Sequence, residues 1–415
     1  MSSTDDNRQN NATGESVAVI KDLESLLREH VDPRLRLLDF TSDNLLPDGE
    51  NYSSIIVKIE ASVRIGDDDR EENLSLVAKT VPQGGHKTQV KTVISFSKEI
   101  FIFESLMPAF KALDPTMDVL PKFYGGRLTL DEESEHNDED IVLLMENLKT
   151  KGYHTKDRKQ GFDYAHAEFA IRELAKWHGL SIALRQKNDE FFARCRRELC
   201  RFPYELQVTS MSDLAEHITR DICADERMAP HKELISRELQ ANLRWNESIE
   251  RPEEGPWAGI THGDFWVNNI MYLDDENGQP KDVKFVDFQM VSALSVLRDL
   301  PYFLCTSCSM EVLRNRVDEL LDSYYETLVE TLKGQDCDLA DYTRASFDEQ
   351  LRQDANPEFI HCLMSLKFFT LEVDDDLDLM DVKSTLFDKQ SSSLYLDRSW
   401  EAVRAYFHKK WLLDC

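Results

Sequence analysis

The sequence predicts an α+β protein with two lobes: a first lobe built on an antiparallel β-sheet and a larger, mainly α-helical second lobe. Two patterns support this fold class. Every second residue from Ile55 to Ile65 is apolar, which is typical of a half-buried strand. After Asp163, apolar residues recur at helical spacing along most of the chain. With 415 residues and 41% hydrophobic content, the chain can fill the cores of two lobes.

The first lobe is expected at residues 17–147, after a polar tail at residues 1–16 that we expect to be disordered. An acidic turn at residues 66–72 ends the alternating strand, and a second strand follows from Leu74 to Val81. The two strands therefore form a hairpin, which carries Lys79 near the end of its second strand.

Two helices and a third strand complete the predicted first lobe. Val17 to His30 carries apolar residues on one face, as an amphipathic helix does. Phe96, Ile100, Phe103 and Met107 also recur at helical spacing, with Glu99 close to that face. The apolar run from Ile141 to Met145 is expected to be a strand that leads into the second lobe.

The second lobe is expected at residues 148–415 and reads as mostly helical. A wide apolar stripe from Asp163 to Leu184 predicts a core helix. Further helices are predicted from Leu313 to Leu332 and from Asp397 to Leu412, and the acidic run at residues 374–378 is expected to be solvated.

A hairpin inside this helical part gathers the most informative residues. The strands Asn269–Leu273 and Val283–Asp287 are joined by a linker containing Asn277-Gly278, a strong turn signal. If they pair antiparallel, Asn269 lies beside Asp287, and Asp264 lies on the loop just before them. Oxygen ligands of this kind suit a hard cation such as Mg²⁺, and a kinase-type phosphoryl-transfer site uses an Asp, an Asn and a second Asp in this order. Each residue alone is better explained as a turn cap or a strand end, whereas all three at this spacing, with His262-Gly263 in front, favour such a site.

Composition excludes several functions. The 49 basic and 78 acidic residues give a net charge of −29, which argues against nucleic acid and anionic membranes as partners. The sequence has no apolar run of membrane-spanning length and no signal-peptide core at its start, so we expect a soluble, cytoplasmic protein. The 8 cysteines are irregularly spaced and are expected to be reduced. Cys305 and Cys308 form a lone CxxC pair, which we do not expect to bind metal.

These motifs resemble the ecdysteroid-kinase-like (CHK-kinase-like) family of insects, within the protein-kinase-like superfamily that includes choline kinases and aminoglycoside phosphotransferases. Gly263 precedes Asp264 where protein kinases usually carry Arg, and the small-molecule relatives carry Gly there. The matching segments are Gly49–Ser54, Val77–Lys79, Phe96–Ile100, Met145–Leu148, Gly152–Tyr153, Leu174–His178, Thr261–Asn269, Val286–Gln289 and Asp299–Leu304.

The resemblance implies a two-lobed kinase-like fold and a role for each motif residue. Asp264 would orient the acceptor hydroxyl and accept its proton. Asn269 and Asp287 would hold Mg²⁺ between the phosphates of ATP. Lys79 would contact the α- and β-phosphates, and Glu99 would pair with Lys79, with Glu104 as a rival for that pairing.

The resemblance also implies how ATP is held. Gly49, Asn51, Ser53 and Ser54 would cover the phosphates through backbone amides and hydroxyls. The backbone of Glu146 to Leu148 would contact adenine.

Other residues are expected to be structural. His178 is interpreted as a core histidine, and Asp299 as a helix cap or a brace for the catalytic loop. Asp287-Phe288-Gln289 replaces the Asp-Phe-Gly of protein kinases, which puts their regulatory flip in doubt here.

The family resemblance implies an ATP- and Mg²⁺-dependent kinase that phosphorylates a small-molecule alcohol, an ecdysteroid or a hydroxylated xenobiotic. Two alternatives stay open: a choline- or ethanolamine-like amino-alcohol kinase, and a pseudokinase that binds a ligand without turnover. The protein is expected to be a monomer. An apolar acceptor needs an apolar, aromatic pocket, and the candidate lining residues are Trp266, Tyr302, Phe303, Phe368 and Phe369.

Overall fold

The computed structural model describes residues 20–45, 54–66, 70–81, 89–130, 140–201, 211–243, 254–370 and 391–412. The tail at residues 1–16, the acidic run at 374–378, and Gly49, Asn51 and Ser53 lie outside the described residues. The chain divides into two compact units: Met1–Phe96 with Pro121–Thr150, and Ser97–Leu120 with Lys151–Cys415.

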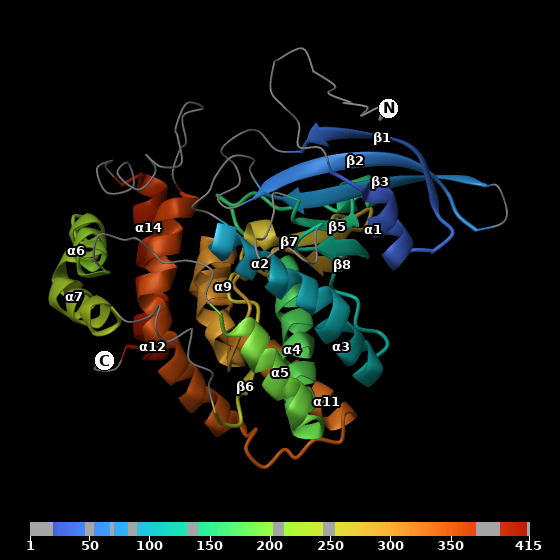
Figure 1. Ribbon diagram of the computed structural model, residues 1–415. Helices are drawn as coiled ribbons and strands as arrows, with labels where there is room; N and C mark the ends of the chain where they lie inside the picture. Colours follow the sequence, from blue (N-terminus) through green and yellow to red (C-terminus); the bar gives the residue numbers. More distant parts are fainter. Residues whose placement is uncertain are drawn as a thin grey trace. The chain divides into compact units, whose positions relative to one another are not determined.

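A five-stranded antiparallel sheet forms the body of the first unit, with strand order β1-β2-β3-β5-β4 (Figure 1). Leu23, Leu26 and Leu27 of helix α1 pack with Val57, Ile59 and Leu76 of the sheet in one buried core. The elements are α1 (Leu23–His30), β1 (Arg36–Asn44), β2 (Ile55–Arg64), β3 (Glu71–Thr80), β4 (Phe123–Arg127) and β5 (Val142–Glu146).

The predicted hairpin of the first lobe is confirmed, because β2 and β3 pair antiparallel from Ile55↔Thr80 to Arg64↔Glu71. The alternation of apolar residues predicted β2 correctly, because its apolar side chains all face the core. These residues are Val57, Ile59, Ala61 and Val63. The predicted strand at Ile141–Met145 is confirmed as β5 with a shift of one residue.

The helix predicted around Phe96 is longer and is interrupted. It consists of α2 (Gln89–Phe101), a π-helical turn (Ile102–Leu106) and α3 (Met107–Leu113). Pro108 explains the interruption, because it has no N–H to donate to a carbonyl one turn earlier.

The segment Ser97–Leu120, expected in the first lobe, groups with the second unit. Two hydrogen bonds hold it there. Lys98 Nζ donates to the Val291 carbonyl at 2.8 Å, and the Phe285 N–H donates to the Val119 carbonyl at 2.7 Å.

The second unit contains two short antiparallel pairs of strands, β6–β9 and β7–β8. The β7–β8 pair is the predicted hairpin, with Ile270 opposite Phe285. Gly278 adopts φ 74° at its turn, as the Asn-Gly signal predicts. The strands are β6 (Ala258–Thr261), β7 (Ile270–Asp274), β8 (Pro280–Phe285) and β9 (Ser292–Ser295).

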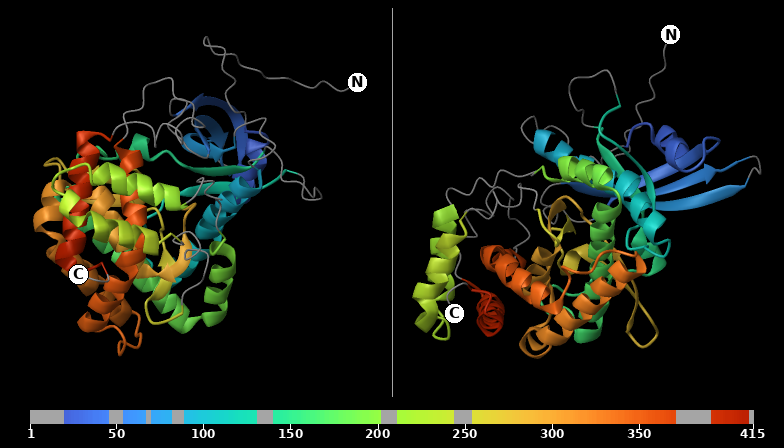
Figure 2. Two further views of the ribbon diagram at one scale, coloured as in Figure 1. Left: turned by 90° about the vertical axis from the view of Figure 1, so that its left-hand side faces the viewer. Right: turned by 90° about the horizontal axis from the view of Figure 1, so that it is seen from below.

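The remainder of the second unit is mainly helical. Helix α4 is capped at its start by Asp163, whose side chain accepts from the His166 N–H, and it packs along α11 (Figure 2). The helices are α4 (Tyr164–Lys187), α5 (Asp189–Leu199), α6 (Met211–Ile222), α7 (Lys232–Ala241), α9 (Asp299–Ser307), α10 (Met310–Asn315), α11 (Val317–Gly334), α12 (Arg344–Phe369) and α14 (Ser393–Lys409), with short helical turns at Leu148–Lys151, Ala229–His231, Val267–Asn269 and Val296–Arg298.

The α+β class is confirmed, with one correction to the helices. The single helix predicted from Leu313 to Leu332 is wrong at its start, because the backbone of Arg316 (φ −129°) separates α10 from α11. Within the described ranges, no helix is both long and apolar enough to cross a membrane.

Candidate functional site

The predicted catalytic loop lies in the second unit between β6 and a short helical turn (Val267–Asn269) that leads into β7. One buried carboxylate fixes its start. Asp299, the first residue of α9, accepts the His262 N–H at 2.7 Å and the Gly263 N–H at 3.0 Å. The His178 imidazole also bonds Asp299, at 3.1 Å. Asp299 therefore braces the catalytic loop, which was one of its two predicted roles. His178 is buried, as expected for a core histidine.

We predict that Asp299→Ala destabilises the protein by about 3–5 kcal/mol, because it leaves one buried and one half-buried backbone N–H group and a buried histidine without their acceptor. Asp299→Asn keeps a carbonyl oxygen and is expected to cost less. Urea denaturation of both variants tests this. Equal stability of Asp299→Ala and the wild type would show that the brace contributes little.

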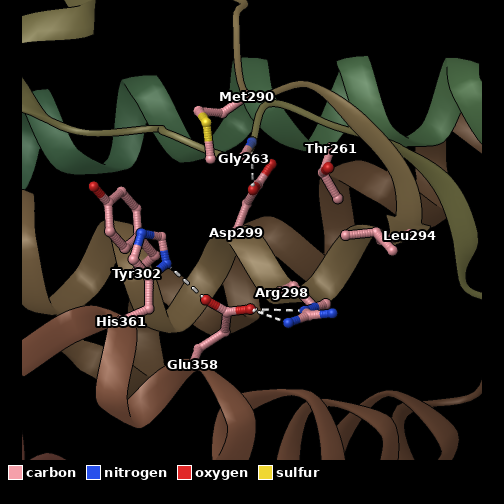
Figure 3. A pocket seen from close by; sticks show the side chains of 9 residues that line it. All are labelled: Thr261, Gly263, Met290, Leu294, Arg298, Asp299, Tyr302, Glu358 and His361. Carbon is pink, nitrogen blue, oxygen red and sulfur yellow. Dashed lines mark hydrogen bonds and ion pairs between the residues drawn. The ribbon is translucent and has the colours of Figure 1, made fainter. Parts of the chain in front are cut away.

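Gly263 is required by the path of the loop. Its φ is 79°, a left-handed conformation that side chains disfavour. A Cβ at this position would lie 2.3 Å from the Met290 carbonyl oxygen, much closer than atoms can approach. Figure 3 shows Met290 directly beside Gly263. Gly263, which in the sequence suggested a small-molecule acceptor, is thus also required by the local backbone conformation.

Asp264 is held by two neighbours. The Tyr302 hydroxyl donates to Oδ1 at 2.7 Å, and the Asn269 amide nitrogen donates to Oδ2 at 3.0 Å. Burial, followed by the charge of Asp287, raises the pKa of Asp264 to about 6, although these hydrogen bonds oppose the rise. The carboxyl group is therefore a stronger base than an ordinary Asp, and near neutral pH it is still mainly ionised.

The side chain of Asn269 is oriented by the same loop. Its amide nitrogen donates to the backbone carbonyl of Asp264 at 2.9 Å as well as to the carboxylate. Because the nitrogen is used in this way, the amide oxygen points away from Asp264 and can serve as a ligand for a cation.

Asp287 follows β8 in a left-handed conformation, with φ 65°. Such a backbone is uncommon outside glycine, and it recurs where a side chain must be aimed at a functional site. The Val286 N–H donates to the Asn269 carbonyl at 3.0 Å, so Asp287 follows the strand end that lies beside Asn269. The structure thus brings Asp264, Asn269 and Asp287 together.

The three residues fit a hard divalent cation better than a zinc-type site. No described group of three or more His, Cys, Asp or Glu side chains is arranged to hold a metal. One carboxylate and one amide oxygen are what Mg²⁺ uses when substrate phosphates supply the remaining ligands. Cys305 and Cys308 are buried, and burial raises the pKa of the Cys308 thiol, so it stays protonated.

The first unit holds the residues expected to contact nucleotide. Lys79 is buried on β3, with Nζ 6.0 Å from the centre of the Phe96 ring, and Ser54 is buried just before β2. The Glu146 N–H donates to the Lys122 carbonyl at 2.9 Å, and the Asn147 N–H donates to the Ser75 carbonyl at 3.0 Å. These bonds fix the expected adenine segment.

Leu148 begins a helical turn directly after that segment. The first N–H of such a turn has no partner within the turn and can donate to a ligand. The hydrogen bonds of Glu146 and Asn147 thus make this segment a rigid support for the Leu148 backbone.

Glu99 lies in the second unit and is 1% exposed, whereas Glu104 is exposed. A buried carboxylate needs a cationic or hydrogen-bonding partner. Burial therefore favours Glu99 over Glu104, and its pairing with Lys79 stays a prediction.

A family model described as "Ecdysteroid kinase-like family" matches residues 48–336, more than half of the chain. The chain belongs to the ecdysteroid kinase-like family. The resemblance inferred from the motifs is therefore confirmed, and with it a small-molecule kinase-like protein. The matched region includes every residue assigned to the predicted site.

Several solved structures are similar to this ecdysteroid kinase-like protein. A choline kinase from Cryptosporidium parvum Iowa II has 10% identity, a TM-score of 0.40, and coverage of 90% of each chain. The amicoumacin kinase hAmiN, in complex with AMP-PNP, Ca²⁺ and Ami, has 12% identity, a TM-score of 0.39, and coverage of 84% of this chain and 89% of its own. No curated protein matches the chain.

The aromatic residues proposed to line an acceptor pocket have different environments in this family member. Trp266 and Phe369 stack face to face, with ring centres 3.6 Å apart and planes at 3°. Phe369 and Phe368 are partly exposed, whereas Phe303 is fully buried in the core. Tyr302 is buried and contacts Asp264. Trp266 is buried as well, and one face of its ring is covered by Phe369, so the partly exposed Phe368 and Phe369 are the remaining candidates for an acceptor wall.

Proposed function

We propose that this protein is an ATP-dependent small-molecule kinase that transfers the γ-phosphoryl group to the hydroxyl of an alcohol. The proposal rests on one observation. In a member of the ecdysteroid kinase-like family, Asp264, Asn269 and Asp287 lie close together at the end of the β7–β8 hairpin. All of the residues that the reaction needs are present in the sequence, which argues against a pseudokinase.

Asp264 orients the acceptor hydroxyl and receives its proton. Its raised pKa of about 6 brings it closer to the working pH, where general bases are most effective. Phosphoryl transfer depends mainly on positioning and on stabilising charge. The two hydrogen bonds that fix the Asp264 carboxylate serve this positioning.

Asn269 and Asp287 are proposed to hold Mg²⁺ through the Asn269 amide oxygen and the Asp287 carboxylate. When bound, the ion neutralises the charge that develops on the phosphates. Lys79 is proposed to contact the α- and β-phosphates, and the Leu148 N–H to donate to adenine. Glu99 is proposed to orient Lys79.

The acceptor is proposed to be an apolar alcohol, an ecdysteroid or a hydroxylated xenobiotic. Phe369 supports this class, because it is partly exposed and stacks on Trp266, which lies between Asp264 and Asn269 in the catalytic loop. An aromatic surface that packs on the catalytic loop suits a large apolar molecule.

We predict that Asp287→Asn lowers the transfer rate by about 10²–10³ at low Mg²⁺, because one ligand that stabilises transition-state charge is weakened. Raised Mg²⁺ is expected to restore part of the rate. The measurement is Mg²⁺-dependent ATP consumption with ecdysteroids, plant glycosides and amino alcohols as acceptors.

Asp336→Asn is the matched control, since Asp336 also has a left-handed backbone, with φ 52°, and lies apart from the three site residues in the sequence. If both variants had the same Mg²⁺ dependence as the wild type, the metal assignment would be wrong. Turnover with amino alcohols alone would favour the choline-like alternative, and ATP binding without any turnover would favour a pseudokinase.

A further inference from the structure

Tyr302 is both buried and hydrogen-bonded to the proposed base, which a residue that only lines a pocket would not require. It lies on α9 one turn after Asp299, and its side chain is 3% exposed. Its hydroxyl donates to Asp264 Oδ1 at 2.7 Å. Burial, followed by the charge of Asp264, raises the pKa of Tyr302 well above its ordinary value. The hydroxyl therefore stays protonated and remains a donor.

The direction of this hydrogen bond follows from its acceptor, because an ionised carboxylate has no proton to donate. The buried Ser365 hydroxyl on α12 is a second hydrogen-bonding neighbour of the Tyr302 hydroxyl. Because the single proton of the Tyr302 hydroxyl is donated to Asp264, its oxygen is left as an acceptor for Ser365. Ser365 and Tyr302 therefore form a short hydrogen-bonded chain that ends on the Asp264 carboxylate.

The Tyr302 ring is also held from the side. It stacks on His361 with ring centres 4.2 Å apart and planes at 14°. His361 bonds Glu358 at 2.9 Å, and Glu358 in turn pairs with Arg298 at 2.6 Å (Figure 3). All of these side chains are buried. The adjoining cavity of about 20 Å³ has room for about one water molecule, which is too little for the ring to swing into.

We propose that Tyr302 is a positioning residue for Asp264. By holding Oδ1, it turns Oδ2 toward the acceptor hydroxyl. Each carboxylate oxygen has about two lone-pair sites. Oδ2 can therefore accept from Asn269 and still bind the hydroxyl. This role rests on the proposed kinase function, and it adds a residue that the motif comparison in the sequence did not assign to catalysis.

The test is Tyr302→Phe, which keeps the ring and its stack on His361 and removes only the hydroxyl. We expect kcat to fall by about 10–10² because the base loses its orientation, with an unchanged KM for ATP. Tyr342→Phe is the matched control. The Tyr342 hydroxyl is also buried, donates at 2.7 Å to the Pro256 carbonyl, and accepts from Arg185, so it reports the general cost of losing such a group.

A second variant, Ser365→Ala, is expected to lower kcat by a smaller factor, because Tyr302 keeps its bond to Asp264 but loses a neighbour that helps to hold its hydroxyl in place. An unchanged or increased kcat in Tyr302→Phe would overturn the positioning role, as would an equal fall in Tyr342→Phe. Failure of the proposed function gives a different result, since the wild type itself would then transfer no phosphoryl group.

Discussion

Asp264→Asn is expected to lower the rate of phosphoryl transfer by about 10³ or more, in line with the loss of a general base and of its charge. The asparagine has nearly the same shape, and it keeps an oxygen that can accept from Tyr302. The Asp299 brace does not involve the Asp264 side chain. The loop is therefore expected to keep its conformation, and ATP is expected to bind with nearly the wild-type Kd.

The measurement is kcat together with the Kd of ATP for the wild type, Asp264→Asn and Glu276→Gln. Glu276 is an exposed residue in the turn of the same hairpin, so Glu276→Gln removes a carboxylate charge outside the site. Only Asp264→Asn should lose turnover. A kcat equal to that of the wild type would contradict the role assigned to Asp264.

Gly263→Ala is expected to destabilise the protein by about 2–5 kcal/mol and to abolish transfer. The left-handed backbone costs about 1–2 kcal/mol for any residue with a Cβ, and crowding in a packed region costs about 1–3 kcal/mol more. The crowding is specific, because the new Cβ would lie 2.3 Å from the Met290 carbonyl oxygen. Relief of that contact must move either the catalytic loop or the segment that follows Asp287.

Gly278→Ala separates the two effects. Gly278 has nearly the same φ, 74°, but a Cβ there would meet nothing within 4 Å. Its variant should show the backbone cost alone and keep full activity. Thermal unfolding and kcat measured for both variants test this, and equal losses in the two variants would show that the Met290 contact is unimportant.

The sequence predicted those parts of the fold in which one pattern dominates. The alternating residues of β2 and the Asn277-Gly278 turn gave the correct pairing of both predicted hairpins. The helix α4 followed from its apolar stripe. In each case local preference and burial favour the same structure.

The elements that were missed lack such a pattern. The strand β1 lies at the edge of the sheet with mostly exposed residues, so it shows no regular alternation. The strands β6 and β9 have four residues each, buried on both faces and rich in small side chains. Neither period two nor period 3.6 can be recognised in so short a run.

The candidate site was predictable where the residues are close in sequence or carry a motif. Asp264, Asn269 and Asp287 converge because one hairpin joins them. The brace by Asp299 was one of two interpretations. The bond from Tyr302 to Asp264 joins residues 38 positions apart. In the sequence Tyr302 belongs to an apolar helix, and only tertiary packing reveals its hydroxyl as a partner of the base.

The fate of the γ-phosphoryl group tests the proposed function most directly. ATP labelled in that group is incubated with the wild-type protein, Mg²⁺ and a panel of apolar alcohols, and the products are separated. We predict that the label appears on an organic alcohol, that chelation of Mg²⁺ abolishes this transfer, and that Asp264→Asn shows none of it. A folded, ATP-binding wild-type protein that labels no alcohol in the panel, or an Asp264→Asn variant that labels it equally well, would contradict the proposal.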